Sequence, residues 1–210
     1  IPFAYLLGTF PSASLFARAA GIDITKVGSG NPGASNISRS LGWRKGVWVF
    51  VLDAAKGAIC AAAGLVIAGR PAGYTLAGAA IIGHILPVGR RLRGGKGVAT
   101  GGGAFAVLSP IVFISGVALW LAVSRLTKLA SLASILAVAV LPIGMVVVGR
   151  DLWEVLTTIG LCAIVMSRHI GNMRRLVTAK MSLSRRAKLW PISCGRSCQI
   201  YRRSICSLSL

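Results

Sequence analysis

Long apolar stretches separated by short polar segments dominate this sequence. The apolar stretches cover about residues 1–20, 46–69, 72–89, 97–123, 130–149 and 152–167. Most of them approach the length of about 20 residues that a helix needs to cross the hydrocarbon core of a bilayer. The pattern therefore predicts a helical protein that passes through the membrane several times, in which lipid replaces a conventional soluble surface.

The stretch 97–123 contains Ser109-Pro110 near its middle. Proline removes a backbone donor and disfavours helical conformation in the residue before it. We expect a short glycine-rich helix over 97–108, which would rise only about 18 Å, and a separate helix over 110–125. The predicted fold class is all-α, a polytopic membrane helix bundle with about seven transmembrane segments, of which this glycine-rich helix is the shortest.

Composition supports a membrane protein and changes how its charge is interpreted. Of the 210 residues, 55% are hydrophobic and only 13% are charged, yet the formal net charge is +20. So apolar a chain is outside the range of soluble domains, and the long apolar stretches argue against a nucleic-acid binder. The basic residues lie between and after these stretches, where they indicate membrane topology and attraction to anionic lipid.

The basic residues also predict an orientation. They follow the first and third apolar stretches, whereas the loop after the second stretch carries only Arg70. Because Lys and Arg concentrate in cytoplasmic loops, we expect the first and third loops to face the cytoplasm. Seven segments, with a break at Pro110, place Lys128 and the basic tail from Arg168 on the same side. The polar segments would then meet at one face of the membrane.

The polar segment 27–45 combines glycines, neutral donors and positive charge. No acidic residue lies between Asp23 and Asp53 to cancel that charge. Glycine lets a backbone bend and approach a ligand closely, and bent backbone with free N–H groups can cradle an anion. This segment is therefore a candidate phosphate site. The alternative is a solvated loop that is basic only because cytoplasmic loops are basic.

Two further patterns carry polar chemistry. The segment 93–97, Arg-Gly-Gly-Lys-Gly, precedes a predicted helix, so phosphate there would meet backbone N–H groups, a helix N-terminus and an ammonium. Its spacing is not that of a P-loop, and a plain basic loop is the alternative. Asp53 and Lys56 lie three residues apart inside an apolar stretch, where we expect them to pair or to face a polar cavity. A lone histidine such as His84 is more often packed than catalytic.

Two more polar groups lie toward the C-terminal end. Ser131 and Ser134 have helical i, i+3 spacing, while His169, Asn172 and Arg175 fall near one helix face. A positively charged stop after the last span is the alternative for the second group.

The cysteines indicate neither a metal site nor a disulfide framework. Cys60 and Cys162 lie in apolar stretches and are expected to act as small hydrophobes. Cys194 and Cys198 lack partners with zinc-like spacing. We expect no metal and no cofactor.

Taken together and in order, these motifs resemble the bacterial acyl-phosphate-dependent glycerol-3-phosphate acyltransferases of the inner membrane. The matching motifs are Gly28–Asn36, Leu52–Gly57, Gly83-His84 with Gly94–Thr100, Ser131–Ser134, and Arg168-His169 with Asn172 and Arg175. The resemblance implies a seven-helix enzyme of phospholipid biosynthesis whose active site faces the cytoplasm. It would transfer an acyl chain from acyl phosphate to glycerol 3-phosphate, giving 1-acylglycerol 3-phosphate (lysophosphatidic acid) and phosphate. A functional link to an enzyme that forms acyl phosphate is part of this expectation.

The resemblance also implies roles for individual residues. The catalytic group would be His169, Ser131 and Asn172. Substrate phosphate would be bound by Ser29, Gly30, Asn31, Ser35, Asn36, Arg39, Gly94, Gly95, Lys96, Gly97 and Thr100. Supporting roles would fall to Asp53, Lys56, His84, Arg168 and Arg175. No enzyme nucleophile is needed because acyl phosphate is already a mixed anhydride, and the general base is either His169 or a phosphate oxygen of the substrate.

We expect a membrane acyltransferase domain over 1–181 and a basic, disordered and dispensable extension over 182–210. Residues 179–181 read Ala-Lys-Met where the family carries Gly-x-Glu. The chain opens inside an apolar stretch without Met, so we expect its natural start to lie upstream. The alternative function is a non-enzymatic transporter for a phosphorylated solute. Against it, no inverted repeat is visible, and the polar residues gather near one face.

Overall fold

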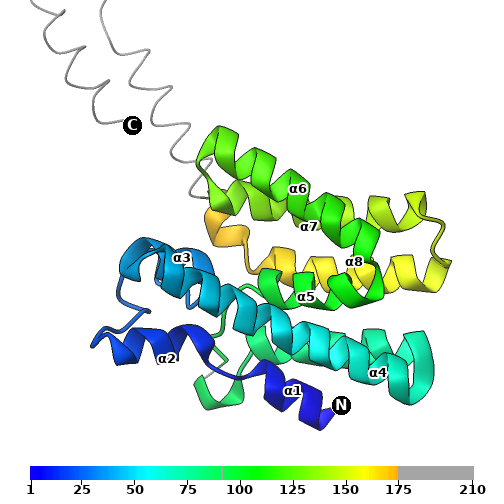
Figure 1. Cartoon of the computed structure of the whole chain (residues 1–210), viewed down its shortest axis with the longest axis horizontal. Coiled ribbons are helices and arrows are strands. Elements are labelled where there is room, and N and C mark those ends of the chain that lie inside the picture. The colour runs from blue at the N-terminus through cyan, green and yellow to red at the C-terminus, as the bar shows by residue number, and fades with distance from the viewer. Residues whose placement is uncertain (91, 175–210) are drawn as a thin grey trace, which may run out of the picture. The chain divides into compact units, whose positions relative to one another are not determined.

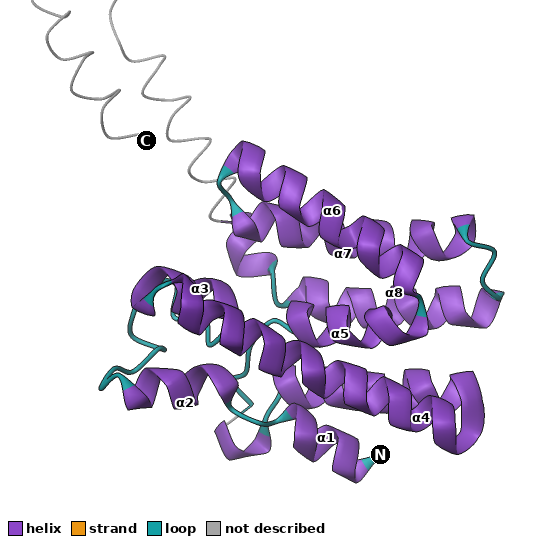
Figure 2. Ribbon diagram, viewed as in Figure 1, coloured by secondary structure: helices purple, strands orange, loops and turns teal. Residues whose placement is uncertain are grey.

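The computed structural model describes residues 1–90 and 92–174, and every regular element in these ranges is a helix (Figures 1 and 2). The helices are α1 (Pro2–Gly8), α2 (Ser12–Ala19), α3 (Ala34–Leu41), α4 (Trp43–Ile85), the 3-10 helix η1 (Val88–Arg90), α5 (Val98–Leu108), α6 (Pro110–Thr127), α7 (Ala130–Val147) and α8 (Leu152–Ser167). These elements belong to one compact unit, Ile1–Ile170. The predicted all-helical fold class is confirmed.

Helix α4 contains the second predicted stretch and most of the third, which ends beyond Ile85 in η1. Its backbone leaves the helical conformation at Ala68 and at Gly69, where φ is 72°, and Pro71 follows two residues later. A positive φ favours glycine, and the missing N–H of proline prevents a regular helix through this point. The two halves pack together where a Cβ at Gly64 would collide with the backbone of Ala72. The sequence predicted two separate segments here, and the structure shows them as the two halves of α4, joined by this kink.

The prediction of a single segment over 1–20 is wrong. The structure has two short helices, α1 and α2, with a break at Thr9–Pro11. Proline explains the break, since Pro11 donates no hydrogen bond and disfavours helical conformation at Phe10. The break leaves backbone carbonyl groups without helical partners. Lys56 Nζ on α4 donates to two of them, at Phe10 (3.0 Å) and Gly8 (3.4 Å).

The predicted break at Ser109 is confirmed. Helix α5 ends at Leu108, Ser109 has an extended φ of −153°, and α6 begins at Pro110. The carbonyl of Leu108 accepts a hydrogen bond of 3.1 Å from the Arg70 guanidinium at the kink of α4. Arg70 also pairs with the buried carboxylate of Glu154 on α8. One cation therefore joins three helices at this end of the bundle.

Close backbone contact holds α5 against α4. A Cβ at Gly103 would collide with the carbonyl of Ala54, and a Cβ at Gly57 would collide with the carbonyl of Thr100. Small residues allow such approach between helices in a membrane. Large apolar side chains lie exposed on the outer faces, as Val66 does, which suits contact with lipid.

Within residues 1–90 and 92–174, three helices are long and apolar enough to cross a membrane: Trp43–Arg90 across its kink, Pro110–Thr127 and Ala130–Val147. Helices α5 and α8 are apolar but shorter. The count of about seven membrane segments stays a prediction.

Candidate active site

A buried ionic cluster lies where α4 meets the break between α1 and α2. Lys56 Nζ is 2.7 Å from Asp53 Oδ1 and 3.2 Å from His84 Nδ1. Asp53 also accepts a hydrogen bond from the Ser12 hydroxyl. All three charged or titratable side chains are almost fully buried. The expected pairing of Asp53 with Lys56 is confirmed, and His84 is packed into the same cluster.

His84 connects this ionic cluster to the glycine-rich loop over residues 93–97. Gly95 N–H donates to the carbonyl of His84 (3.2 Å), and a Cβ at Gly95 would collide with the imidazole ring. Gly94 N–H donates to the carbonyl of Ile85 (3.1 Å). These glycines therefore fit the loop tightly against the end of α4, directly before Lys96.

Beyond Lys96, Gly97 is the N-cap of α5 with a left-handed φ of 85° and no side-chain cap. The α5 N-terminus beside Lys96 suits an anion. Thr100 is fully buried in the contact between α4 and α5, so a ligand would reach its hydroxyl only from inside the bundle.

The buried side chain of Asn36 holds together the glycine-rich loop over residues 27–33, which precedes α3. Its Oδ1 accepts from Ser29 N–H (3.0 Å), and its Nδ2 donates to the carbonyls of Val27 (3.0 Å) and Ile24 (3.4 Å). A direct phosphate contact from this amide would require one of these bonds to break. Ser29, Ser35 and Arg39 are exposed, whereas Gly30 and Asn31 are half-buried. The exposed donors are therefore the better placed to meet a soluble substrate.

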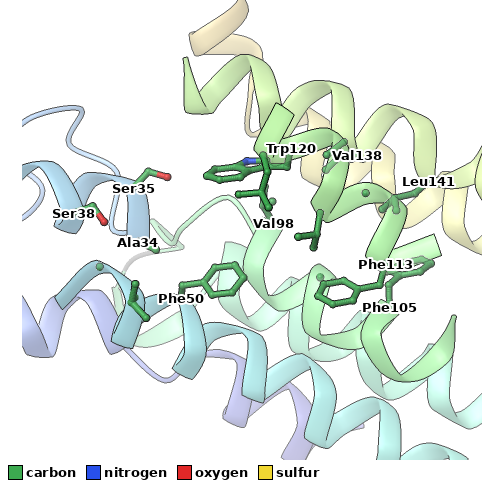
Figure 3. A pocket seen from close by; sticks show the side chains of 17 residues that line it. Ala34, Ser35, Ser38, Phe50, Val98, Phe105, Phe113, Trp120, Val138 and Leu141 are labelled. Carbon is green, nitrogen blue, oxygen red and sulfur yellow. The ribbon is translucent and has the colours of Figure 1, made fainter. Parts of the chain in front are cut away.

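An apolar groove of about 390 Å³ opens beside this loop (Figure 3). Its volume lies in the range of small-molecule sites. The lining comes from α3 to α7: Ala34, Ser35, Ser38, Gly46, Val47, Phe50, Val98, Gly102, Phe105, Phe113, Gly116, Val117, Trp120, Leu121, Ala137, Val138 and Leu141. Figure 3 shows Ser35 and Ser38 at one end and Phe105, Phe113 and Leu141 at the other. The groove is thus apolar along its length and polar where it meets α3.

Sequence reasoning missed this groove. The signal was present on α6, whose lining residues follow helical i, i+3, i+4, i+7, i+8 spacing from Phe113 to Leu121. Every face of a membrane helix is apolar, however, so that stripe does not stand out.

The serine pair on α7 lies beside the groove wall. Trp120 Nε1 donates to Ser134 Oγ (3.0 Å), and Ser134 in turn donates to the carbonyl of Ala130 (2.9 Å). Ser131, one turn earlier, is half-buried and does not line the groove. Its predicted catalytic role stays a prediction.

His169 follows α8 and is 1% exposed. Its Nδ1 lies 3.0 Å from the carbonyl of Val165. A carbonyl only accepts hydrogen bonds, so Nδ1 carries the proton and Nε2 of the neutral ring carries the lone pair. Burial lowers the pKa of His169, the hydrogen bond to Val165 opposes this, and the positive charge of Lys96 lowers the pKa further. The structure therefore brings Lys96 within electrostatic range of a neutral histidine.

The remaining predicted site residues lie at or beyond the C-terminal end of α8, where the structure describes fewer contacts. Arg168 is exposed at the C-cap of α8. Asn172 belongs to the second unit, Gly171–Leu210, and Arg175 and the extension 182–210 lie outside the described residues. The described ranges contain no group of three or more His, Cys, Asp or Glu side chains that could hold a metal ion. Cys60 and Cys162 are buried free thiols.

Comparison with known proteins identifies the family. The family model for glycerol-3-phosphate acyltransferase matches residues 1–179. The glycerol-3-phosphate acyltransferase of Sinorhizobium fredii is 36% identical over 183 residues, covering 87% of this chain and 89% of that protein. The Aquifex aeolicus enzyme of the same name is 38% identical over 184 residues, covering 85% and 94%.

Similar solved structures point to the same family. The crystal structure of PlsY (YgiH), an integral membrane glycerol 3-phosphate acyltransferase, in its glycerol 3-phosphate form has a TM-score of 0.81 and 36% identity, covering 84% of this chain and 90% of that one. The lysophosphatidic acid form of PlsY gives a TM-score of 0.79, also at 36% identity, covering 84% and 89%. This chain therefore belongs to the glycerol-3-phosphate acyltransferase family and is an integral membrane acyltransferase.

Proposed function

We propose that this protein transfers an acyl chain from acyl phosphate to the hydroxyl of glycerol 3-phosphate, releasing lysophosphatidic acid and phosphate. One observation carries the proposal: the apolar groove ends at Ser35 and Ser38 of α3, beside the exposed cation Arg39. A lipid donor with a charged head requires such an arrangement. Its chain would lie in the groove and its phosphate at the α3 end.

The same polar end suits the second substrate, which also carries phosphate. PlsY has been crystallised with glycerol 3-phosphate and with lysophosphatidic acid, and it shares 36% of its residues with this chain over the compared region. Arg39 and Lys96 would neutralise the two phosphate groups, and Ser29 would add a neutral donor. Ser131 would complete the pocket.

The chemistry needs no covalent enzyme intermediate. The glycerol hydroxyl oxygen attacks the acyl carbon, the bond from that carbon to the phosphate oxygen breaks, and inorganic phosphate leaves with the bonding electron pair. The protein contributes orientation and stabilises the charge on the developing oxyanion and the departing phosphate. His169 Nε2 is the candidate acceptor for the hydroxyl proton, because it carries the lone pair of the neutral ring when Nδ1 is protonated.

The choice of acyl phosphate over other donors rests on the motif resemblance. The inner-membrane location also rests on that resemblance. The cytoplasmic orientation rests on the basic loops, and membrane lipid is the expected surrounding partner. Single cysteines at Ser38 and Arg93 would test that orientation. Their labelling by an impermeant external reagent in intact cells would contradict it.

The decisive experiment supplies purified protein in detergent with palmitoyl phosphate and glycerol 3-phosphate. Phosphate release and lysophosphatidic acid are measured together and should rise in equal amounts. Palmitoyl-CoA at matched concentration should give no product. Equal rates from both donors would refute the donor assignment, and no transfer from palmitoyl phosphate would refute the proposed reaction.

A further inference from the structure

The apolar groove is open to lipid near its polar end and closed at the other. Val47 and Phe50 on α4 and Leu121 on α6 line it while remaining 48%, 44% and 39% exposed. On a membrane protein such apolar exposure faces lipid, so an acyl chain can enter sideways without crossing water. The groove therefore has a side entrance close to the site of chemistry.

The closed end is a wall made by Phe105, Phe113 and Leu141 (Figure 3). Phe113 reaches across from α6, and a Cβ at Gly102 of α5 would lie 3.6 Å from its ring. Core side chains that are 2% exposed or less lie next to this wall: Leu108 and Met145 are one turn farther along α5 and α7, and Val112 is adjacent to Phe113 on α6. An acyl chain that reaches Phe113 therefore meets packed protein beyond it.

The length of the groove can be worked out from α6. Its lining runs from Phe113 to Leu121, and the eight steps between these two residues rise about 12 Å. An extended hydrocarbon chain advances about 1.25 Å per carbon for bonds of about 1.5 Å at tetrahedral angles. The groove between Leu121 and Phe113 thus accommodates roughly ten carbons in extended form.

Burial alone cannot select a chain length here. An acyl chain arriving from the bilayer leaves surroundings as apolar as the groove, so the hydrophobic gain per methylene that applies in water is absent. Discrimination must come from packing and from steric exclusion at the wall. The residue that forms the movable part of the wall then decides which chains are accepted.

We propose that Phe113 sets the acyl-chain length preference by closing the deep end of the groove. This inference rests on the proposed acyl transfer and names a specificity-determining residue for it. Phe113 is half-buried and packs against the core without belonging to its fully buried part. Its side chain can therefore be replaced by a smaller one without removing a core residue. Chains longer than the groove must displace this ring or leave through the side entrance.

The test measures kcat/KM for acyl phosphates of 10 to 18 carbons at saturating glycerol 3-phosphate. Phe113→Ala should raise the ratio of the 18-carbon to the 10-carbon value at least tenfold, the discrimination that one methylene can cause in an apolar pocket. Gly116→Val should lower the ratio, because its Cβ fits at 3.5 Å from Leu141 and its methyl groups would occupy the groove. Ile114→Ala, on the exposed face of the same helix, is the matched control and should keep the wild-type ratio.

A second measurement keeps the inference separate from the proposed reaction. The rise in melting temperature caused by alkyl phosphates of 10 to 18 carbons reports how well each chain fits the groove, without turnover. The chain length that gives the largest rise should increase in Phe113→Ala. If the wild-type protein transfers no acyl chain, the proposed function fails, but the alkyl phosphate series still measures the depth of the groove. Unchanged length profiles in both Phe113→Ala and Gly116→Val would overturn the role of Phe113. Should Phe113→Ala fail to fold, Phe113→Leu provides a smaller shortening with the same expected direction.

Discussion

Replacing Asp53 with alanine would leave Lys56 as a buried cation without its carboxylate. The two side chains are 2% and 4% exposed, and their charged atoms lie 2.7 Å apart. Removing one partner of a buried pair typically costs about 3–5 kcal/mol, because the remaining charge is left uncompensated. We therefore expect Asp53→Ala to be among the most destabilising single substitutions in this chain.

The structure adjusts that magnitude in two directions. Lys56 would keep its hydrogen bonds to the Phe10 and Gly8 carbonyls, which lowers the cost. Ser12 would lose the carboxylate to which it donates, and a buried hydroxyl without an acceptor costs about 1–3 kcal/mol. These effects offset one another, so the expected loss stays near 3–5 kcal/mol.

A double-mutant cycle tests the reasoning. Asp53→Ala, Lys56→Ala and the double variant are unfolded in detergent by heat and by denaturant. Because the double variant leaves no unpaired charge, it should lose less stability than the sum of the single variants, by about 0.5–3 kcal/mol. The exposed Asp23→Ala is the control and should change little. Wild-type stability in Asp53→Ala, or strict additivity, would show that the pair is not a coupled buried unit.

Three further predictions concern the site and the packing around it. Arg39→Lys and Lys96→Ala should each slow transfer roughly ten- to a hundredfold, as expected for a lost charge-assisted hydrogen bond of about 1.5–3 kcal/mol, with little change in thermal stability. Near wild-type kinetics in both would remove them from the site. Since burial lowers the pKa of His169, the acid limb of kcat/KM should fall below the ordinary histidine range near 6.5, and Lys96→Met should move the limb to higher pH. An acid limb at or above that range would count against His169. Gly103→Ala should destabilise by about 1–3 kcal/mol through collision with the α4 backbone, whereas Gly101→Ala, with its Cβ 3.8 Å from a side chain, should not.

The sequence predicted the helix breaks better than it predicted helix faces. Pro110 and the Gly69–Pro71 region are local signals, because they act through backbone geometry that needs no partner. The same signal at Pro11 was present and was overlooked in favour of an uninterrupted apolar stretch. Asp53 and Lys56 could also be paired from spacing alone, since lipid leaves charged side chains few alternatives.

The groove and the role of Asn36 could not be read in the same way. A soluble helix shows its buried face by its polar face, but a membrane helix is apolar all round and loses that contrast. The groove is assembled from five helices, so its existence depends on how they pack. Asn36 is similar to a phosphate-binding residue in type and position, and only its three loop hydrogen bonds show that it shapes the backbone.

The helix breaks and the buried charges have one physical explanation. A broken helix in a membrane leaves carbonyl groups that lipid cannot satisfy, and each unsatisfied group is costly. At the break between α1 and α2 the donor is Lys56, and at the end of α5 the donor is Arg70. A cation supplies strong donors at these places, so its own burial is offset by the backbone groups that it satisfies.

Each of these cations then needs a counter-charge. Lys56 pairs with Asp53, and Arg70 pairs with Glu154, so two of the four acidic residues in the chain are committed to this purpose. Charges inside a membrane protein are often taken as evidence of a transport pathway or a catalytic centre. Here the hydrogen bonds give both pairs a structural task that follows from proline and glycine in the helices. The charged residues proposed to handle substrate lie elsewhere, on the short helix α3, in the loop before α5 and after α8.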